Sequence, residues 1–293
     1  MKKLFILLLF VFKVAVSAQS IAINTNGSAA NAAAILELTS TTKGFLPPLM
    51  TESQRNAIVL PLAGLQVWCT NCGTSGEMQI YNGTTWTNLL GGAATSLTCG
   101  AFVSATVFKV FMCHNLGADT SADPNVPVQA IHGNYYQWGR SAVVANASAT
   151  SGGISGWNIT DASNGAWADG NKTANDPCPL GFRVPTFLQW NYIATSPTVN
   201  FISRTGTWTA SATNFGSAIH FGATAGAKSL TLPAPGFRHD TTGALFSRGS
   251  YGFYWSSTES GSYGTKLSFY ETGVIADDGS YRTYGFSVRC VSE

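Results

Sequence analysis

Six cysteines are the residues whose types and spacing most directly predict chemistry in this chain. An even number of cysteines in an exported chain favours disulfides, and six cysteines allow fifteen pairings. We favour three pairs, of which the last closes by far the longest loop and so stabilises most in the chain-entropy model. The predicted disulfides are Cys69–Cys72, Cys99–Cys113 and Cys178–Cys290.

The first pair has the C-x-x-C spacing, which is also found in zinc and redox sites. A zinc site needs two further ligands at a matching spacing, and no second C-x-x-C or H-x3-H occurs in the sequence. A thioredoxin-like redox site needs a βαβ context, which the surrounding pattern lacks. We therefore interpret Cys69 and Cys72 as a local structural disulfide.

Two tryptophans in a polar, glycine-rich stretch form the candidate ligand site. Trp157 and Trp167 lie among amide and carboxylate side chains, and exposed rings beside such groups suit stacking and hydrogen bonding to a glycan. The same surface would suit a surface protein, because aromatic residues dominate many interfaces. The alternative is that both rings fold back over the core. The predicted ligand-binding residues are Trp157, Asn158, Asp161, Asn164, Trp167 and Asn171.

The sequence predicts no catalytic residue, no cofactor and no metal ligand. The four histidines have no metal-pair spacing, although His114 adjoins Cys113, and no nucleophile elbow, metalloprotease or phosphate-binding motif occurs. Calcium is a further cation to consider, because turns at 169–171, 175–176 and 277–279 carry carboxylate and amide oxygens. None of these turns has EF-hand spacing, and solvated turn residues are the favoured interpretation.

The N-terminus and the composition set the location and the class of partner. Residues 1–18 begin with the positive pair Lys2 and Lys3, followed by an apolar run and by small residues before Gln19, which predicts a secretory signal peptide and hence a secreted or cell-surface protein. We expect no membrane span after its cleavage. Only 10% of the residues are charged and the net charge is +2. Without a basic patch, nucleic acid is not an expected partner.

The elements expected over residues 19–95 form a small β-rich module. Residues 65–68 and 78–81 alternate apolar and polar side chains, as half-buried strands do. Asn82-Gly83 predicts a two-residue hairpin turn with positive φ at both residues, after which 84–87 returns. The stretch 91–96 has the composition of a linker.

The rest of the chain, residues 96–293, is expected to form one domain of short strands with little helix. Thr186 and Gln189 have capping-box spacing, which predicts a helix that ends near Thr195. Residues 141–176 are expected to be a long loop region. At the C-terminus, Asp278-Gly279 predicts a turn, and a last strand over 286–290 places Cys290 on its buried face.

Two stretches resemble known families. Residues 42–51, 54–58, 61–65 and 81–86 resemble an N-terminal module of exported Bacteroidetes proteins that is itself similar to phage tail-fibre segments. Leu49 stands where arginine is usual in that module. Since tail-fibre segments trimerise, this resemblance implies a homotrimer.

The motifs at 115–119, 133–140, 176–186, 254–258 and 285–291 resemble, in this order, the Fibrobacter succinogenes major paralogous domain. The resemblance implies a C-type-lectin-like α+β fold, mostly β, with long loops and a disulfide holding the last strand. Residues 182–190 are also similar to formylglycine-generating enzymes, whose C-terminal cysteine pair is absent here. We therefore expect a non-enzymatic adhesion protein that binds a glycan through its long loops, with a structural subunit of an extracellular fibre as the alternative.

Overall fold

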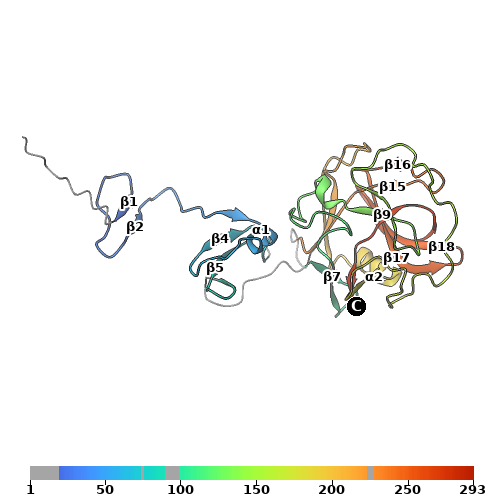
Figure 1. Ribbon diagram of the computed structural model, residues 1–293, viewed down its shortest axis with the longest axis horizontal. Helices are drawn as coiled ribbons and strands as arrows, with labels where there is room; N and C mark the ends of the chain where they lie inside the picture. Colours follow the sequence, from blue (N-terminus) through green and yellow to red (C-terminus); the bar gives the residue numbers. More distant parts are fainter. Residues whose placement is uncertain (1–19, 74–75, 90–98, 223–227) are drawn as a thin grey trace, which may run out of the picture. The chain divides into compact units, whose positions relative to one another are not determined.

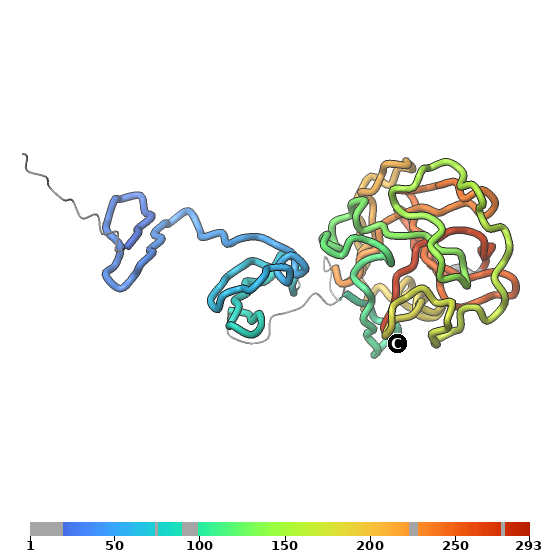
Figure 2. The backbone as a smooth tube through the Cα atoms, viewed as in Figure 1, coloured from blue at the N-terminus to red at the C-terminus, as the bar shows by residue number. Residues whose placement is uncertain are grey.

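The computed structural model describes residues 20–73, 76–89, 99–222 and 228–293. The predicted signal peptide over 1–18 and the predicted linker and domain boundary near residue 95 lie outside these residues. The chain divides into two compact units, Met1–Pro47 and Pro48–Glu293. Figures 1 and 2 show that strands and loops dominate both, which confirms the expected mostly β fold with few helices.

The described part of the first unit holds one small sheet. Strands β1 (Ile21–Ile23) and β2 (Leu36–Leu38) pair in parallel, with Ile21 opposite Leu36. Neither strand is covered by a second layer, so apolar side chains stay between 46% and 62% exposed. These side chains are Ile21, Ile23, Leu36 and Leu38.

The second unit begins with a four-stranded sheet. Its order is β3-β4-β5-β6, in which only the β3/β4 pair is parallel. Both alternating segments predicted from the sequence form strands here. The bounds are β3 Leu49–Met50, β4 Gln66–Cys69, β5 Glu77–Tyr81 and β6 Trp86–Asn88.

The hairpin between β5 and β6 differs from the prediction. Tyr81 pairs with Trp86, so the loop has four residues instead of two. Gly83 has φ +99°, while Asn82 is absent from the residues with positive φ. The Asn82 side chain instead accepts hydrogen bonds from the backbone N–H groups of Thr84 and Thr85 at 2.9 and 2.8 Å. Asparagine thus closes this turn through its side chain.

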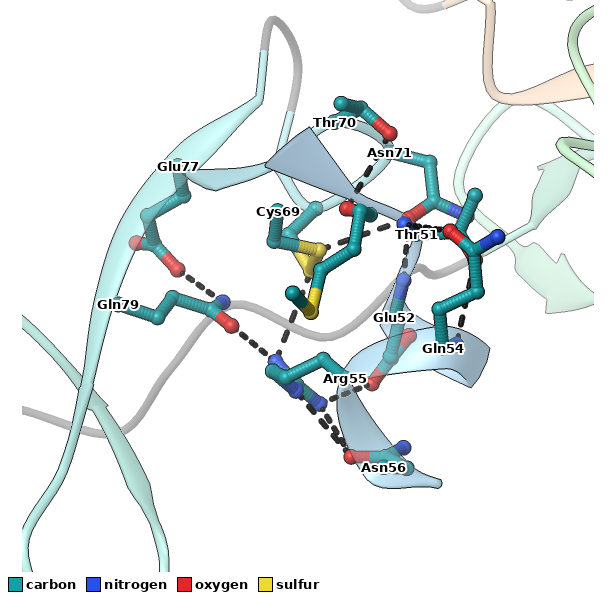
Figure 3. The surroundings of a disulfide bond; sticks show 12 residues. Thr51, Glu52, Gln54, Arg55, Asn56, Cys69, Thr70, Asn71, Glu77 and Gln79 are labelled. Atoms are coloured by element: carbon teal, nitrogen blue, oxygen red, sulfur yellow. Dashed lines mark hydrogen bonds and ion pairs between the residues drawn. A yellow bond between two sulfur atoms is a disulfide. The ribbon is translucent and has the colours of Figure 1, made fainter. Parts of the chain in front are cut away.

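Helix α1 (Glu52–Asn56) places an arginine beside the first disulfide. Thr51 and Gln54 form a capping box at its start. Arg55 is only 4% exposed, and its guanidinium lies 3.7 Å from the Cys72 sulfur and donates to Glu52 and Gln79. Figure 3 shows this network around the bonded pair. Both sulfur-bearing residues are fully buried, so the disulfide is shielded from water.

A six-stranded sheet is the centre of the C-terminal domain. Its order is β10-β9-β20-β17-β18-β19, and only the β17/β20 pair is parallel. The bounds are β9 Asn134–Tyr136, β10 Val143–Asn146, β17 Tyr251–Ser260, β18 Tyr263–Tyr270, β19 Val274–Tyr281 and β20 Phe286–Ser287.

Smaller elements surround this sheet. A three-stranded sheet has the order β12-β13-β14, and β7/β8, β11/β21 and β15/β16 form pairs. The bounds are β7 Gly100–Phe102, β8 Phe108–Val110, η1 Gln129–Ile131, β11 Phe182–Arg183, α2 Phe187–Thr195, β12 Phe201–Thr205, β13 Ala218–Gly222, β14 Leu230–Pro233, β15 Phe237–Arg238, β16 Leu245–Phe246 and β21 Val291–Ser292.

The six-stranded sheet separates two apolar clusters. Successive residues of a strand point to opposite faces. Tyr254 accordingly joins the first cluster, with Trp190 of α2 and residues of β13 and β14. Trp255 joins the second cluster, with Trp138 and Trp167. Helix α2 has the capping box and the end at Thr195 that the sequence predicts. Each face of β17 is therefore buried by a different layer.

The predicted last strand is split. Residues 286–287 and 291–292 form β20 and β21, in different sheets. Cys290 is fully buried as predicted, but Ser287 and Arg289 are fully buried too. Arg289 donates to Asn115 and to the backbone of Cys113, and burial lowers its pKa to about 10. These hydrogen bonds compensate the burial of the Arg289 guanidinium, so the alternating pattern does not mark a solvent face here.

The predicted turn at Asp278-Gly279 is wrong. Strand β19 runs through both residues, and the register with β18 shifts between Gly264 and Thr265. Gly279 has φ +149°. The glycine therefore accommodates one extra residue as a bulge within the strand.

Candidate ligand-binding site

An aromatic groove lies beside strands β15, β17 and β20. Its volume is about 480 Å³, and six of its eight lining residues are aromatic. We call this cavity the aromatic groove. It is lined by Phe237, Phe253, Tyr263, Gly279, Ser280, Tyr281, Tyr284 and Phe286.

Strand pairing places these rings together from distant parts of the sequence. Tyr254 of β17 pairs with Ser287 of β20, which brings their neighbours Phe253 and Phe286 into stacked contact with centroids 5.3 Å apart. Phe237 of β15 packs against Phe253 at 5.3 Å. The base of the groove therefore belongs to the second apolar cluster, which makes it rigid.

Tyrosines form the more exposed wall. Tyr284 stacks on Phe286 at 5.6 Å and on Tyr281 at 6.3 Å. Tyr281 in turn contacts Tyr263 at 5.3 Å. Tyr281 is 52% exposed and Tyr263 40%. These two rings present both an apolar face and a hydroxyl to a ligand.

The groove is electrically neutral. None of its lining residues carries a charge at neutral pH. Burial, together with the nearby Asp240 carboxylate, raises the pKa of Tyr284, so that its hydroxyl stays protonated and can donate. His239 contacts Tyr284, and its Nδ1 lies 2.9 Å from an Asp240 carboxylate oxygen.

Trp157 contacts the two chain segments next to the tyrosine wall of the groove. It is half-buried, and its indole N–H donates to the backbone oxygens of Asp240 and Thr283 at 2.9 and 3.2 Å. Its ring also packs on Gly243, where a Cβ would approach ring carbon Cε3 to 2.3 Å. Trp157 thus holds together the two segments that carry His239 and Tyr284. It supports the aromatic groove but does not line it.

The prediction of an exposed ring is wrong for Trp167. This side chain is 1% exposed, packs on Trp138 with centroids 5.5 Å apart and donates to the Asn175 backbone oxygen. Arg282 covers the same Trp138 ring at 4.3 Å. Aromatic and cation contacts inside the second cluster therefore bury a residue that lies in polar sequence.

The four polar residues of the predicted site stay exposed and separate. Asp161 lines a polar pocket of about 370 Å³ with Arg140 and Asn175, and no other predicted ligand residue lines that pocket. None of the predicted residues lines the aromatic groove. The exposed residues are Asn158, Asp161, Asn164 and Asn171.

All three predicted disulfides are present. Cys178–Cys290 lies within the second cluster and joins residues 112 positions apart. It pins the end of the 141–176 segment, which Figure 2 shows in yellow-green at the periphery of the C-terminal domain. Apart from β10, this segment has the loop structure that the sequence predicts. The other two pairs are Cys69–Cys72 and Cys99–Cys113.

Comparison with known families agrees with this architecture. Residues 64–292 match the Fibrobacter succinogenes major domain, which covers well over half of the chain. The chain belongs to the Fibrobacter succinogenes major domain family. Residues 22–100 match a phage tail like trimerisation region. No curated protein and no solved structure matches the chain.

The two family matches are consistent with a surface or structural protein, and the trimerisation match is consistent with a homotrimer. Within the ranges that the structure describes, neither helix has the length and apolarity needed to cross a bilayer.

The amino-acid composition of one segment could have indicated the aromatic groove. Residues 251–286 of the Fibrobacter succinogenes major domain are unusually dense in tyrosine and phenylalanine.

The histidines of the Fibrobacter succinogenes major domain have structural contacts. His114 adjoins Cys113, whose sulfur is in a disulfide, and its ring contacts the Ala122 backbone oxygen at 2.9 Å. His132 and His220 are each 1% exposed, and burial lowers the pKa of both to about 4. Neutral, enclosed imidazoles of this kind lack access to a ligand.

The carboxylates considered for calcium also have partners. Asp169 accepts hydrogen bonds from Ser257 and Thr258. Asp176 accepts from the backbone of Cys178 and Val184 and pairs with Lys172. Across the described ranges, no group of three or more His, Cys, Asp or Glu side chains could hold a metal ion.

Proposed function

We propose that the chain is a secreted or cell-surface binding protein without enzymatic activity, and that its Fibrobacter succinogenes major domain holds a neutral polysaccharide in the aromatic groove. The observation that carries this proposal is the composition of the groove. Six aromatic rings and no charged side chain line it. The long loops, where the sequence placed the ligand, act instead through Trp157 as a support for the groove wall.

Carbohydrate chemistry suits such a lining. A sugar ring has an apolar face of C–H groups and a periphery of hydroxyls. The apolar face stacks on aromatic rings, and the hydroxyls bond to tyrosine O–H groups. Tyr281 and Tyr263 offer both features at the exposed wall. A charged polymer would find no complementary charge among the lining residues.

Several features support binding without catalysis. Every cysteine is in a disulfide, so no thiolate is available as a nucleophile. Ser256 bonds to Thr265 and lies buried. Three disulfides also suit an oxidising, extracellular compartment.

Affinity electrophoresis tests the proposal. The full chain is run through gels that contain laminarin, xylan, mannan or dextran, and binding appears as retarded migration. We expect retardation by at least one polymer and about tenfold weaker binding for Tyr281→Ala, which corresponds to about 1.4 kcal/mol. Phe108→Ala is the matched control, because Phe108 is 39% exposed and lies outside the groove. Binding that Tyr281→Ala leaves unchanged would contradict the groove as the site.

A second candidate function is a structural subunit of an extracellular fibre, favoured by the trimerisation match over residues 22–100. The exposed apolar residues of β1 and β2 agree with it, because an isolated two-stranded sheet is at best marginally stable in water. Association with further copies would cover these side chains. Light scattering of the full chain decides the point: a trimer supports this function, and a strict monomer at high concentration contradicts it.

A further inference from the structure

The ring contacts of the aromatic groove continue beyond its lining residues. Phe253 stacks on Tyr251, with centroids 5.8 Å apart and planes 12° from parallel. Tyr251 then contacts Tyr270 at 5.3 Å. These tyrosines are 39% and 37% exposed, and neither lines the groove. We call Tyr251 and Tyr270 the outer tyrosine pair.

The outer tyrosine pair is held in place. Tyr251 and Tyr270 are directly opposite in the β17/β18 ladder. Tyr270 also lies against Gly273, where a Cβ would come within 2.5 Å of ring carbon Cζ. The backbone N–H of Tyr270 donates to the Gly273 oxygen at 3.0 Å. Rings fixed in this way lose little conformational entropy when a ligand stacks on them.

The exposed rings are far apart along one strand. Tyr263 and Tyr270 are the first and last residues of β18. At about 3.3 Å per residue, their Cα atoms lie about 23 Å apart. Tyr263 lines the same groove as Phe253, on which the outer tyrosine pair stacks. Ring contacts through Phe253, Phe286, Tyr284 and Tyr281 join the outer tyrosine pair to Tyr263.

We propose that the groove and the outer tyrosine pair together bind the interior of an extended, unbranched neutral glycan, with its sugars stacked on the exposed tyrosines of the groove and of the outer pair. This inference rests on the proposed function and specifies its ligand as a chain instead of a terminal sugar. Beside the outer tyrosine pair, the Nε–H of Arg204 donates to the Tyr270 backbone oxygen.

A length series tests the inference. Isothermal titration calorimetry compares the di- through hexasaccharides of laminarin, xylan and mannan on the full chain. We expect affinity to rise with each added sugar up to the hexasaccharide. We expect Tyr251→Ala/Tyr270→Ala to weaken hexasaccharide binding about tenfold and to leave disaccharide binding unchanged. The control is Phe108→Ala/Phe201→Ala, whose parent residues are 39% and 37% exposed and lie outside the ring series.

The outcomes separate the two proposals. Equal affinity for the di- and hexasaccharide, or an unchanged hexasaccharide affinity in the outer-pair variant, overturns the extended site while groove binding stands. A wild-type chain that binds none of the glycans overturns both the extended site and the groove as a glycan site. Thermal unfolding of each variant shows whether a lost affinity reflects a lost fold.

Discussion

The strand pair β1/β2 and the six-stranded sheet use similar apolar side chains with opposite results. Ile23 and Leu36 stay more than half exposed, whereas Leu267 and Phe269 of β18 are fully buried. The difference is the second layer: α2 and the three-stranded sheet cover β18, and nothing in the described part of the first unit covers β1/β2. An apolar strand therefore predicts burial only where a partner layer exists, within the chain or in another copy.

The unfolding free energy of the C-terminal domain is the quantity that tests this contrast. Changes inside its two clusters should lower it strongly, and changes in β1/β2 should leave it unaltered and alter assembly instead.

The largest effect is expected from Cys178→Ser/Cys290→Ser. The pair joins residues 112 positions apart, and loops near this length contribute about 4–5 kcal/mol in the chain-entropy model. Chemical denaturation measures the loss. Cys69→Ser/Cys72→Ser is the matched control, since its three-residue separation predicts about 2 kcal/mol. Equal losses for the two variants would contradict the loop-length argument.

Trp167→Ala should destabilise the domain by about 3–5 kcal/mol, because it leaves a cavity against Trp138 in the second cluster. Trp157 is only half-buried, so Trp157→Ala should cost less stability and should instead weaken glycan binding by loosening Tyr284. Denaturant unfolding and affinity electrophoresis measure the two effects. The reverse ranking in stability would show that the buried tryptophan was misidentified.

Acid should destabilise the C-terminal domain by about 3 kcal/mol between about pH 7.5 and 5.5 through its buried histidines. Burial lowers the pKa of His132 and His220 from 6.5 to about 4. Between pH 6.5 and about pH 4, these two histidines bind protons in the unfolded chain but not in the folded chain. The stability that these neutral histidines contribute is therefore complete above about pH 7.5 and falls as the pH drops toward 4.

Denaturant unfolding at both pH values checks this dependence. His132→Gln should remove about half of the loss that His132 and His220 cause together. His114, whose pKa burial also lowers, contributes equally in the variant and in the wild type. A loss as large as that of the wild type would mean that other groups cause it.

The smallest effect on C-terminal stability is expected from Ile23→Asp/Leu36→Asp. Charges on β1 and β2 oppose the burial of this face between copies. Light scattering should show dissociation of the oligomer, while the C-terminal unfolding free energy changes by less than about 0.5 kcal/mol. A large drop in that free energy would contradict the independence of the two regions.

Local features were predicted well from the sequence. The capping box at Thr186 and the C-x-x-C disulfide involve residues three positions apart, so their geometry follows from the residues themselves. The pairing Cys178–Cys290 was also predicted correctly, and the family motifs agree with the family match. The lectin-like fold and the secreted location stay predictions.

Long-range packing was predicted poorly. Trp167 is buried and Arg289 enclosed because partners distant in sequence surround them. The aromatic groove was missed for the same reason, since it exists only where β20 pairs with β17.

The sequence by itself determined the cap at Thr186, the number of disulfides, the low charge and the strands β4, β5 and β6, because these depend on composition and on contacts within a few residues. Only the tertiary structure decided which aromatic rings meet, which tryptophan is covered and which apolar strands remain bare. The physical reason is that burial depends on a second layer, and the residues of that layer come from elsewhere in the chain or from another copy.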